Sequence, residues 1–184
     1  VYNVPPFRTK DVPWIDVISE AFNNPLRMLA GWYLTRTAAV PISTLLLSYW
    51  MVGCYFMAVK RYAEFRELTA DTLPRYRKSF HYYSERSLLS GILFYGSAAM
   101  LFLGGFIVRY RLELILSFPL VALVMSAYLW LAFQPHSPVQ HPEGLYREPL
   151  VLIPVALCAL VMGILLFVDV PLIYRLFPPT SVGF

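Results

Sequence analysis

The sequence predicts an all-α integral membrane protein, a polytopic bundle of about five transmembrane helices. Hydrophobic residues make up 58% of the 184 residues and charged residues only 14%, whereas a soluble domain carries about a quarter charged residues. The mean hydropathy is +0.58, and the apolar residues are gathered in stretches of the roughly 20 residues that a helix needs to cross a bilayer. These observations exclude an ordinary water-soluble fold, a disordered chain and a disulfide-rich secreted domain.

The first predicted element is a weakly apolar segment, residues 12–32, which contains three charged side chains. Asp16, Glu20 and Arg27 are spaced by four and seven residues, which places them on one face of a helix. We interpret the segment as a span that lines a polar cavity, because ionisable groups at membrane depth are costly and usually functional. An interfacial amphipathic helix and a purely structural ion pair are the alternatives.

Four further stretches are long and apolar enough to be spans, and each is bounded by charged or turn-forming residues. They are residues 39–59, 88–108, 112–133 and 150–173. We expect them, with 12–32, to form one membrane domain over residues 1–184, with a cytoplasmic loop at 60–87. Cys54 and Cys158 lie inside the apolar stretches and are interpreted as packing residues.

The distribution of basic residues predicts the orientation. With five alternating spans, most Lys and Arg residues fall on one side of the membrane: Arg8, Lys10, Lys60, Arg61, Arg66, Arg75, Arg77, Lys78, Arg86 and Arg147. The positive-inside rule makes this side cytoplasmic. The net charge of +4 is then explained by topology and requires no nucleic-acid partner.

Two polar regions on the predicted cytoplasmic side could carry chemistry. Arg8 and Lys10 follow a Pro-Pro pair, and cations at a helix entry suit a phosphate or diphosphate, although a basic lead-in is also an ordinary start of a span. Glu64 and Glu67 follow a span at helical spacing, and such carboxylates can hold Mg²⁺ through its waters. A solvated helix end with ion pairs is the simpler explanation.

Three stretches together resemble a known family. Residues 1–33, VYNVPPFRTKDVPWIDVISEAFNNPLRMLAGWY, resemble the segment of UbiA-type intramembrane prenyltransferases in which a Tyr and a Lys precede a span with a Leu-Arg-x-x-Ala-Gly pattern. VKRYAEFREL (59–68) and LPRYRKSFHYYSERSL (73–88) are most similar to the decaprenyl-phosphate phosphoribosyltransferase branch. The five spans look like helices five to nine of the nine-helix UbiA fold.

The resemblance implies a transferase of the bacterial inner membrane that acts on a polyprenyl phosphate or diphosphate with Mg²⁺ as cofactor. It implies a substrate-binding role for Tyr2, Arg8, Lys10, Asp16 and Arg27. It also implies a catalytic role for Lys60, Arg61 and Glu64, and metal binding by Glu64 and Glu67. The partners would be a membrane lipid or isoprenoid phosphate and other membrane subunits.

Two departures from the family pattern leave alternatives open. The KRYAE run at 60–64 replaces the DxxxD of typical members, and the sequence contains no first Asp-rich motif of the NDxxD kind. We therefore expect the chain to be the C-terminal half of a larger transferase whose acidic motif precedes Val1. The alternative is a non-catalytic UbiA-derived subunit that scaffolds a membrane complex. A small transporter is disfavoured because the spans show no internal repeat.

Overall fold

The computed structural model describes residues 8–35, 39–68, 78–140 and 142–177, and the regular structure in these ranges is helical, which confirms the all-α fold class. The helices are α1 (Ile15–Ala21), α2 (Asn23–Leu34), α3 (Ser43–Glu67), α5 (Glu85–Tyr110), α6 (Phe118–Ala132), α7 (Pro142–Leu145), α8 (Pro149–Leu165) and α9 (Pro171–Leu176). Short 3₁₀ helices are η1 (Thr9–Asp11), η2 (Lys78–His81), η3 (Leu112–Ser117) and η4 (Pro138–Gln140).

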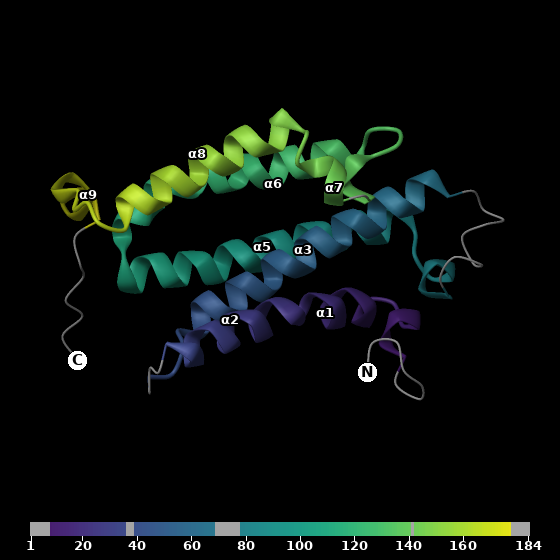
Figure 1. Ribbon diagram of the computed structural model, residues 1–184, viewed down its shortest axis with the longest axis horizontal. Coiled ribbons are helices and arrows are strands. Elements are labelled where there is room, and N and C mark those ends of the chain that lie inside the picture. The colour runs from purple at the N-terminus through teal and green to yellow at the C-terminus, as the bar shows by residue number, and fades with distance from the viewer. Residues whose placement is uncertain (1–7, 36–38, 69–77, 141, 178–184) are drawn as a thin grey trace.

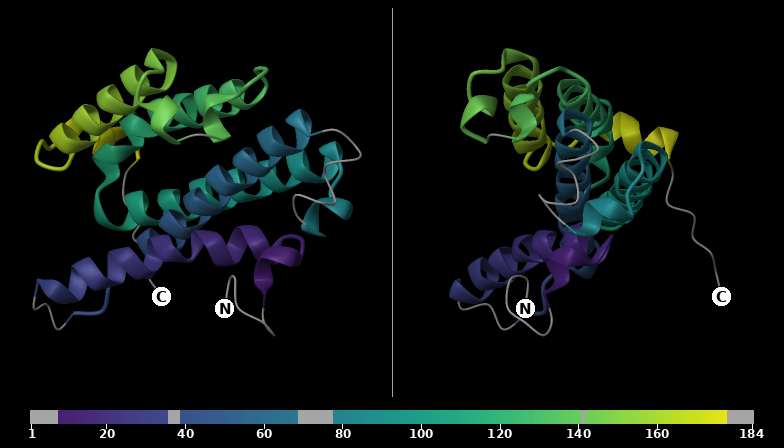
Figure 2. Two further views of the ribbon diagram at one scale, coloured as in Figure 1. Left: turned by 45° about the vertical axis from the view of Figure 1, so that its right-hand side comes forward. Right: turned by 90° about the vertical axis from the view of Figure 1, so that its right-hand side faces the viewer.

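The helices lie in three layers (Figure 1). The pair α3 and α5 forms the middle layer and makes the largest interface between helices. α1 and α2 pack on α3 from one side, and α6 and α8 form the layer on the other side (Figures 1 and 2). Successive long helices run in alternating directions, so the start of α1, the end of α3, the start of α5 and the turn after α6 meet at one end of the bundle (Figure 1).

Two of the described helical segments are long and apolar enough to cross a membrane. They are Glu85–Tyr110, which is α5, and Leu112–Ala132, in which η3 continues into α6. They match two of the predicted spans, 88–108 and 112–133. α5 begins where Ser84 and Ser87 cap each other, with the Ser84 Oγ accepting from the Ser87 N–H at 3.2 Å and the Ser87 Oγ accepting from the Ser84 N–H at 2.9 Å.

The predicted span at 150–173 is shorter in the structure. α8 ends at Leu165, and α9 starts only at Pro171. The end of α8 is fixed by Arg111, whose Nε donates to the Leu165 carbonyl at 3.2 Å and whose Nη1 contacts the Asp169 carboxylate at 2.7 Å. A cation that satisfies a terminal carbonyl is a favourable way to end a helix.

The segment 12–32 is two helices rather than the single helix that we predicted, and the break lies at Phe22. The cause is Pro25, which has no N–H to donate to the Ala21 carbonyl and whose ring crowds that carbonyl. The break separates the three charges that we expected on one face, because Asp16 and Glu20 lie before it and Arg27 after it.

α3 extends further than the predicted span at 39–59 and carries residues 60–67 of the predicted loop in its last two turns. The side chains on these turns explain the extension, since Tyr62 and Ala63 are buried in the core. Residues 60–67 of the region assigned to the cytoplasmic loop are therefore helical, as the helical spacing of Glu64 and Glu67 predicted, while residues 69–77 lie outside the described part of the chain.

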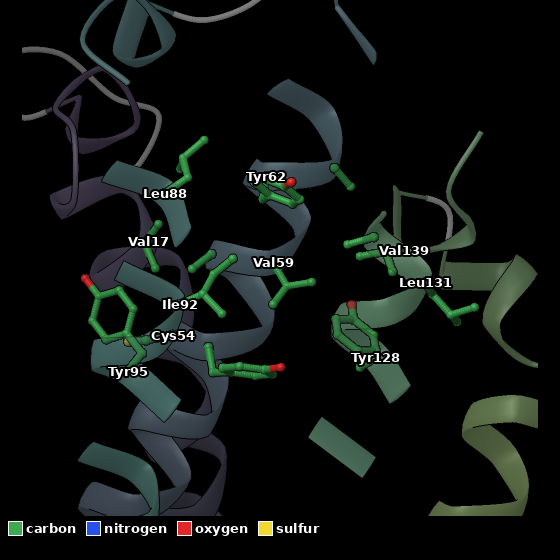
Figure 3. Packing of buried hydrophobic residues seen from close by; sticks show 14 of the residues in the cluster. Val17, Cys54, Val59, Tyr62, Leu88, Ile92, Tyr95, Tyr128, Leu131 and Val139 are labelled. Atoms are coloured by element: carbon green, nitrogen blue, oxygen red, sulfur yellow. The ribbon is translucent and has the colours of Figure 1, made fainter. Parts of the chain in front are cut away.

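The main core lies between the three layers and is rich in aromatic rings (Figure 3). Its members include Val17 of α1, Cys54, Val59 and Tyr62 of α3, Leu88, Ile92 and Tyr95 of α5, and Tyr128 and Leu131 of α6. Cys54 and Cys158 are both buried and free, as the packing interpretation predicted. This core holds the polar end of α3 against α1 and α5, where the candidate site lies.

Candidate functional site

The site is a group of charged side chains around Arg61, near the end of α3. The Arg61 side chain is only 2% exposed, and its guanidinium group contacts three carboxylates. Nη1 donates to Glu64 at 2.8 Å, Nε lies 3.4 Å from Asp16, and Nη2 pairs with Glu20. Charged hydrogen bonds of this kind are the strong ones in a protein interior. The contacts therefore fasten the first helix of the described chain to the end of α3.

Tyr83, just before α5, completes the group. Its hydroxyl donates to the Asp16 carboxylate at 2.6 Å and accepts from the Trp14 backbone N–H at 2.7 Å. The Trp14 ring also meets the Tyr83 ring edge to face, with 5.4 Å between the centroids. Trp14 has a φ of 67°, a conformation that costs energy in a non-glycine residue and is often found at functional sites. We call Asp16, Glu20, Arg61, Glu64 and Tyr83 the Arg61 cluster.

Burial determines the protonation of the tyrosines at this end. Burial raises the pKa of Tyr83 far above its ordinary value, and the neighbouring negative charge of Asp16 raises it further. Tyr83 therefore keeps the proton that it donates to Asp16. Burial and the hydrogen bond to Glu85, at 3.0 Å, likewise raise the pKa of Tyr62 to about 12.

The raised pKa of Tyr62 predicts a pH dependence of stability. The unfolded tyrosine has a pKa of about 10, so its contribution is fully present below pH 10 and is lost as the pH rises through about 12. Between these two pH values, the free energy of unfolding of the wild type should fall with pH more steeply than that of Tyr62→Phe, by about 1.4 kcal/mol per pH unit. Titrations with SDS in mixed micelles at pH 9–12 measure it. Tyr146→Phe, at a side chain that is 78% exposed, is the control, and equal slopes for the two variants would contradict the prediction.

The other predicted substrate-binding residues are spread over this end and the middle of the bundle. Arg8 forms an ion pair with Asp11 at 3.1 Å. Lys10 and Lys60 are half-buried and have no ion pair with other described residues. Tyr2 lies outside the described residues.

Arg27 lies apart from the Arg61 cluster. It is exposed on α2 and lines an open groove of about 420 Å³ with Met28, Leu45 and Tyr49. The structure does not bring Arg27 together with Asp16 and Glu20, because Arg27 is exposed beside this groove whereas Asp16 and Glu20 contact Arg61.

The carboxylates that we predicted as metal ligands already have other partners. Glu64 binds Arg61, whereas Glu67 accepts from His136 Nδ1 at 2.8 Å and from Gln140. Among the described residues, no group of three or more His, Cys, Asp or Glu side chains could hold a metal ion. These residues do not fit an all-protein Mg²⁺ site, since Mg²⁺ requires several oxygen ligands arranged around one point.

A second feature of the bundle is an apolar groove of about 550 Å³ between α5 and α6. It is lined by Tyr55 of α3, by Leu93 and Met100 of α5, and by Met125 and Leu129 of α6, among others. The Tyr55 hydroxyl donates to the Met125 carbonyl at 2.7 Å and so links α3 to α6 beside the groove. The chemistry of the lining suits a hydrocarbon chain.

Sequence reasoning missed Tyr83 and Glu20 as members of the site. Glu20 was recognised only as a charge on the first segment, and its position four residues after Asp16 was the available signal. Tyr83 stands in the run FHYYSER without any local signal, because its partner Asp16 is 67 residues away.

The fold and the cluster define an all-helical protein with two helices able to cross a membrane and a buried charged group at one end. Comparisons of the chain with protein-family models, with curated proteins and with solved structures found no match.

Proposed function

We propose that the chain forms the C-terminal part of a UbiA-type membrane transferase that acts on a polyprenyl phosphate or diphosphate. The specific reaction that we propose is phosphoribosyl transfer to a polyprenyl phosphate, because the sequence most resembles the branch of the family with that activity. The observation that supports this proposal best is the contact between Asp16 and Arg61. It joins two of the three stretches that carry the resemblance, through RTKDVPWIDV and VKRYAEFREL, although 45 residues separate the two side chains.

In this proposal the Arg61 cluster has a positioning role. Arg61 is buried and engaged by carboxylates, so the cations that would contact phosphate are the half-buried Lys10 and Lys60. The cluster fixes the backbone from which Lys60 projects. The contribution to catalysis would be orientation of the phosphate and stabilisation of its charge.

The remaining parts of the substrate would use the two grooves. The apolar groove between α5 and α6 would take part of the isoprenoid tail, and Arg27 would contact a polar group in the groove beside α2. Mg²⁺, which the resemblance implies, would have to be held by the substrate phosphates and by acidic residues outside the described ranges. The cluster end, which carries most of the basic residues, would face the cytoplasm of a bacterial inner membrane.

The test is a transfer assay of the native polypeptide, with any residues that precede Val1, in lipid nanodiscs. With a labelled polyprenyl phosphate and a phosphoribosyl diphosphate, we expect transfer, and Lys60→Gln should lower kcat/KM by about 10- to 100-fold because a charge-assisted contact is lost. Arg109→Gln is the matched control, since Arg109 lies at the other end of α5 beside Tyr110. Equal activity of Lys60→Gln and Arg109→Gln would refute the assigned role of Lys60.

A non-catalytic membrane subunit of the same fold is the second candidate. The observation that favours it is that Asp16 and Glu64 are engaged by Arg61 within the chain, so these carboxylates already have a structural role. A well-folded native polypeptide that transfers nothing and co-purifies with other membrane proteins would support this candidate over the transferase.

A further inference from the structure

A second polar cavity lies at the same end of the bundle, on the opposite side of α3. It has a volume of about 410 Å³ and is lined by the last turn of α3 and by the turn that follows α6. Ala63, Arg66 and Glu67 line it, and at 100° per residue they lie on the face of α3 opposite to Arg61. The cavity is therefore separate from the Arg61 cluster.

His136 also lines this cavity, and its backbone has an uncommon conformation. Its φ is 53°, a left-handed conformation that is uncommon in a non-glycine residue. The conformation brings Nδ1 to 2.8 Å from the Glu67 carboxylate, while the side chain remains 92% exposed. The contact of Nδ1 with a carboxylate fixes the orientation of the ring, so Nε2 is directed away from Glu67 and is available to a ligand.

The contact between His136 and Glu67 is not needed to anchor the turn that follows α6. The turn is already attached by the Arg66 Nη1 bond to the Phe133 carbonyl at 2.8 Å and by the Gln140 bond to the Ala63 carbonyl at 3.3 Å. The Ser137 hydroxyl adds a further bond, to the Leu131 carbonyl at 2.7 Å. An exposed ion pair adds little to the stability that these bonds provide.

Arg66 supplies a second cationic group to the cavity. Its guanidinium lies over the rings of Tyr62 and Phe133, 5.9 Å and 5.8 Å from their centroids. Only Nη1 has a hydrogen-bond partner among the described residues. Both oxygens of Glu67 are occupied by His136 and Gln140, which offsets the repulsion that this carboxylate would exert on an anion.

We propose that this cavity binds a phosphate group, which accepts hydrogen bonds from the free donors of Arg66 and from Nε2 of His136. A planar guanidinium fork matches phosphate oxygens. The imidazolium form of His136, which donates from both nitrogens, would join the ligand to Glu67. The phosphate could belong to a soluble molecule or to the headgroup of an anionic lipid, since both present the same oxygens. The site does not depend on the transfer reaction proposed above.

Nitrogen-15 NMR of histidine-labelled native polypeptide tests the proposal, because His136 can be assigned from the spectrum of His136→Gln. Inorganic pyrophosphate is added to the protein in detergent, and in a second arm nanodiscs of phosphatidylglycerol are compared with nanodiscs of phosphatidylcholine. A saturable shift of the His136 Nε2 signal in the first arm identifies a soluble ligand, and a shift confined to the second arm identifies a lipid headgroup. No shift of His136 in either arm overturns the proposal, even if signals of other histidines move.

Two arginine variants make the test specific. Arg66→Gln should weaken binding about tenfold, as expected for the loss of one charge-assisted contact, and Arg66→Lys should fall between Arg66→Gln and wild type because it keeps the charge without the fork. Arg109→Gln removes an equal charge at the other end of the bundle and should leave the affinity unchanged. Equal affinities for Arg66→Gln and Arg109→Gln would also overturn the proposal. The readout needs no enzymatic activity, so it is independent of the proposed transferase.

Discussion

Replacement of Arg61 by methionine is expected to lower the free energy of unfolding by about 3–5 kcal/mol. Methionine fills a similar volume, but the Asp16 and Glu64 carboxylates, whose side chains are 0% and 7% exposed, would lose their cationic partner. Breaking a buried ion pair by removal of one member is strongly destabilising, since the remaining charge stays desolvated. SDS titration of the native polypeptide in mixed micelles at pH 8, followed by circular dichroism, measures the change.

The control for Arg61→Met is Arg66→Met, five residues further along the same helix. Arg66 is exposed and bonds a carbonyl group and two rings rather than buried carboxylates, so we expect a loss of about 1 kcal/mol or less. The loss in Arg61→Met should also be smaller at pH 5 than at pH 8, because carboxylates without a partner can be buried as neutral acids. If both variants unfold alike at both pH values, the Arg61 cluster does not hold α1 to α3.

The sequence predicted those parts of the fold that depend on long apolar runs. The spans at 88–108 and 112–133 agree with α5 and with η3 and α6 to within a few residues, because hydrophobic length alone decides them. The break at Phe22 was missed, although Pro25 supplies a local reason for it. The helix end at residues 60–67 was predicted as solvated, whereas the structure buries Tyr62 and Ala63 there.

Several residues of the candidate site were identified from the sequence, but the contacts between them were not. Asp16, Arg61 and Glu64 were chosen as site residues. The contact between Arg61 and Glu64 is a local pair three residues apart on α3, whereas the contact between Arg61 and Asp16 depends on how α1 packs against α3, which no local pattern encodes. Glu113, which stands in the apolar run LELILSF, was not chosen as a site residue. The structure buries Glu113 completely in the turn between α5 and α6, 3.6 Å from Arg111 Nε. Charges inside predicted spans are therefore the positions where a contact should be sought first.

The close approach of the Trp14 ring, just before α1, to Gly91 of α5 gives the second large prediction. A Cβ atom on Gly91 would overlap Cζ3 of the Trp14 ring and lie 2.8 Å from Cη2. The rigid indole cannot yield without moving the Trp14 backbone, whose N–H bonds the Tyr83 hydroxyl. We expect Gly91→Ala to cost about 2–3 kcal/mol of unfolding free energy through overpacking, measured by the same SDS titration.

Gly104 on the same helix provides a matched control for this substitution. No atom lies within 4 Å of the position that a Cβ on Gly104 would occupy, so Gly104→Ala should stabilise α5 by about 0.5–1 kcal/mol through its helix propensity. The two Gly→Ala changes in one helix are thus expected to have opposite signs. Addition of Trp14→Leu to Gly91→Ala should recover part of the loss, because the smaller side chain leaves room for the new methyl group. A Gly91→Ala variant that is as stable as Gly104→Ala would mean that Trp14 does not lie against α5, and the link from Trp14 through Tyr83 to the Arg61 cluster would then lose its anchor.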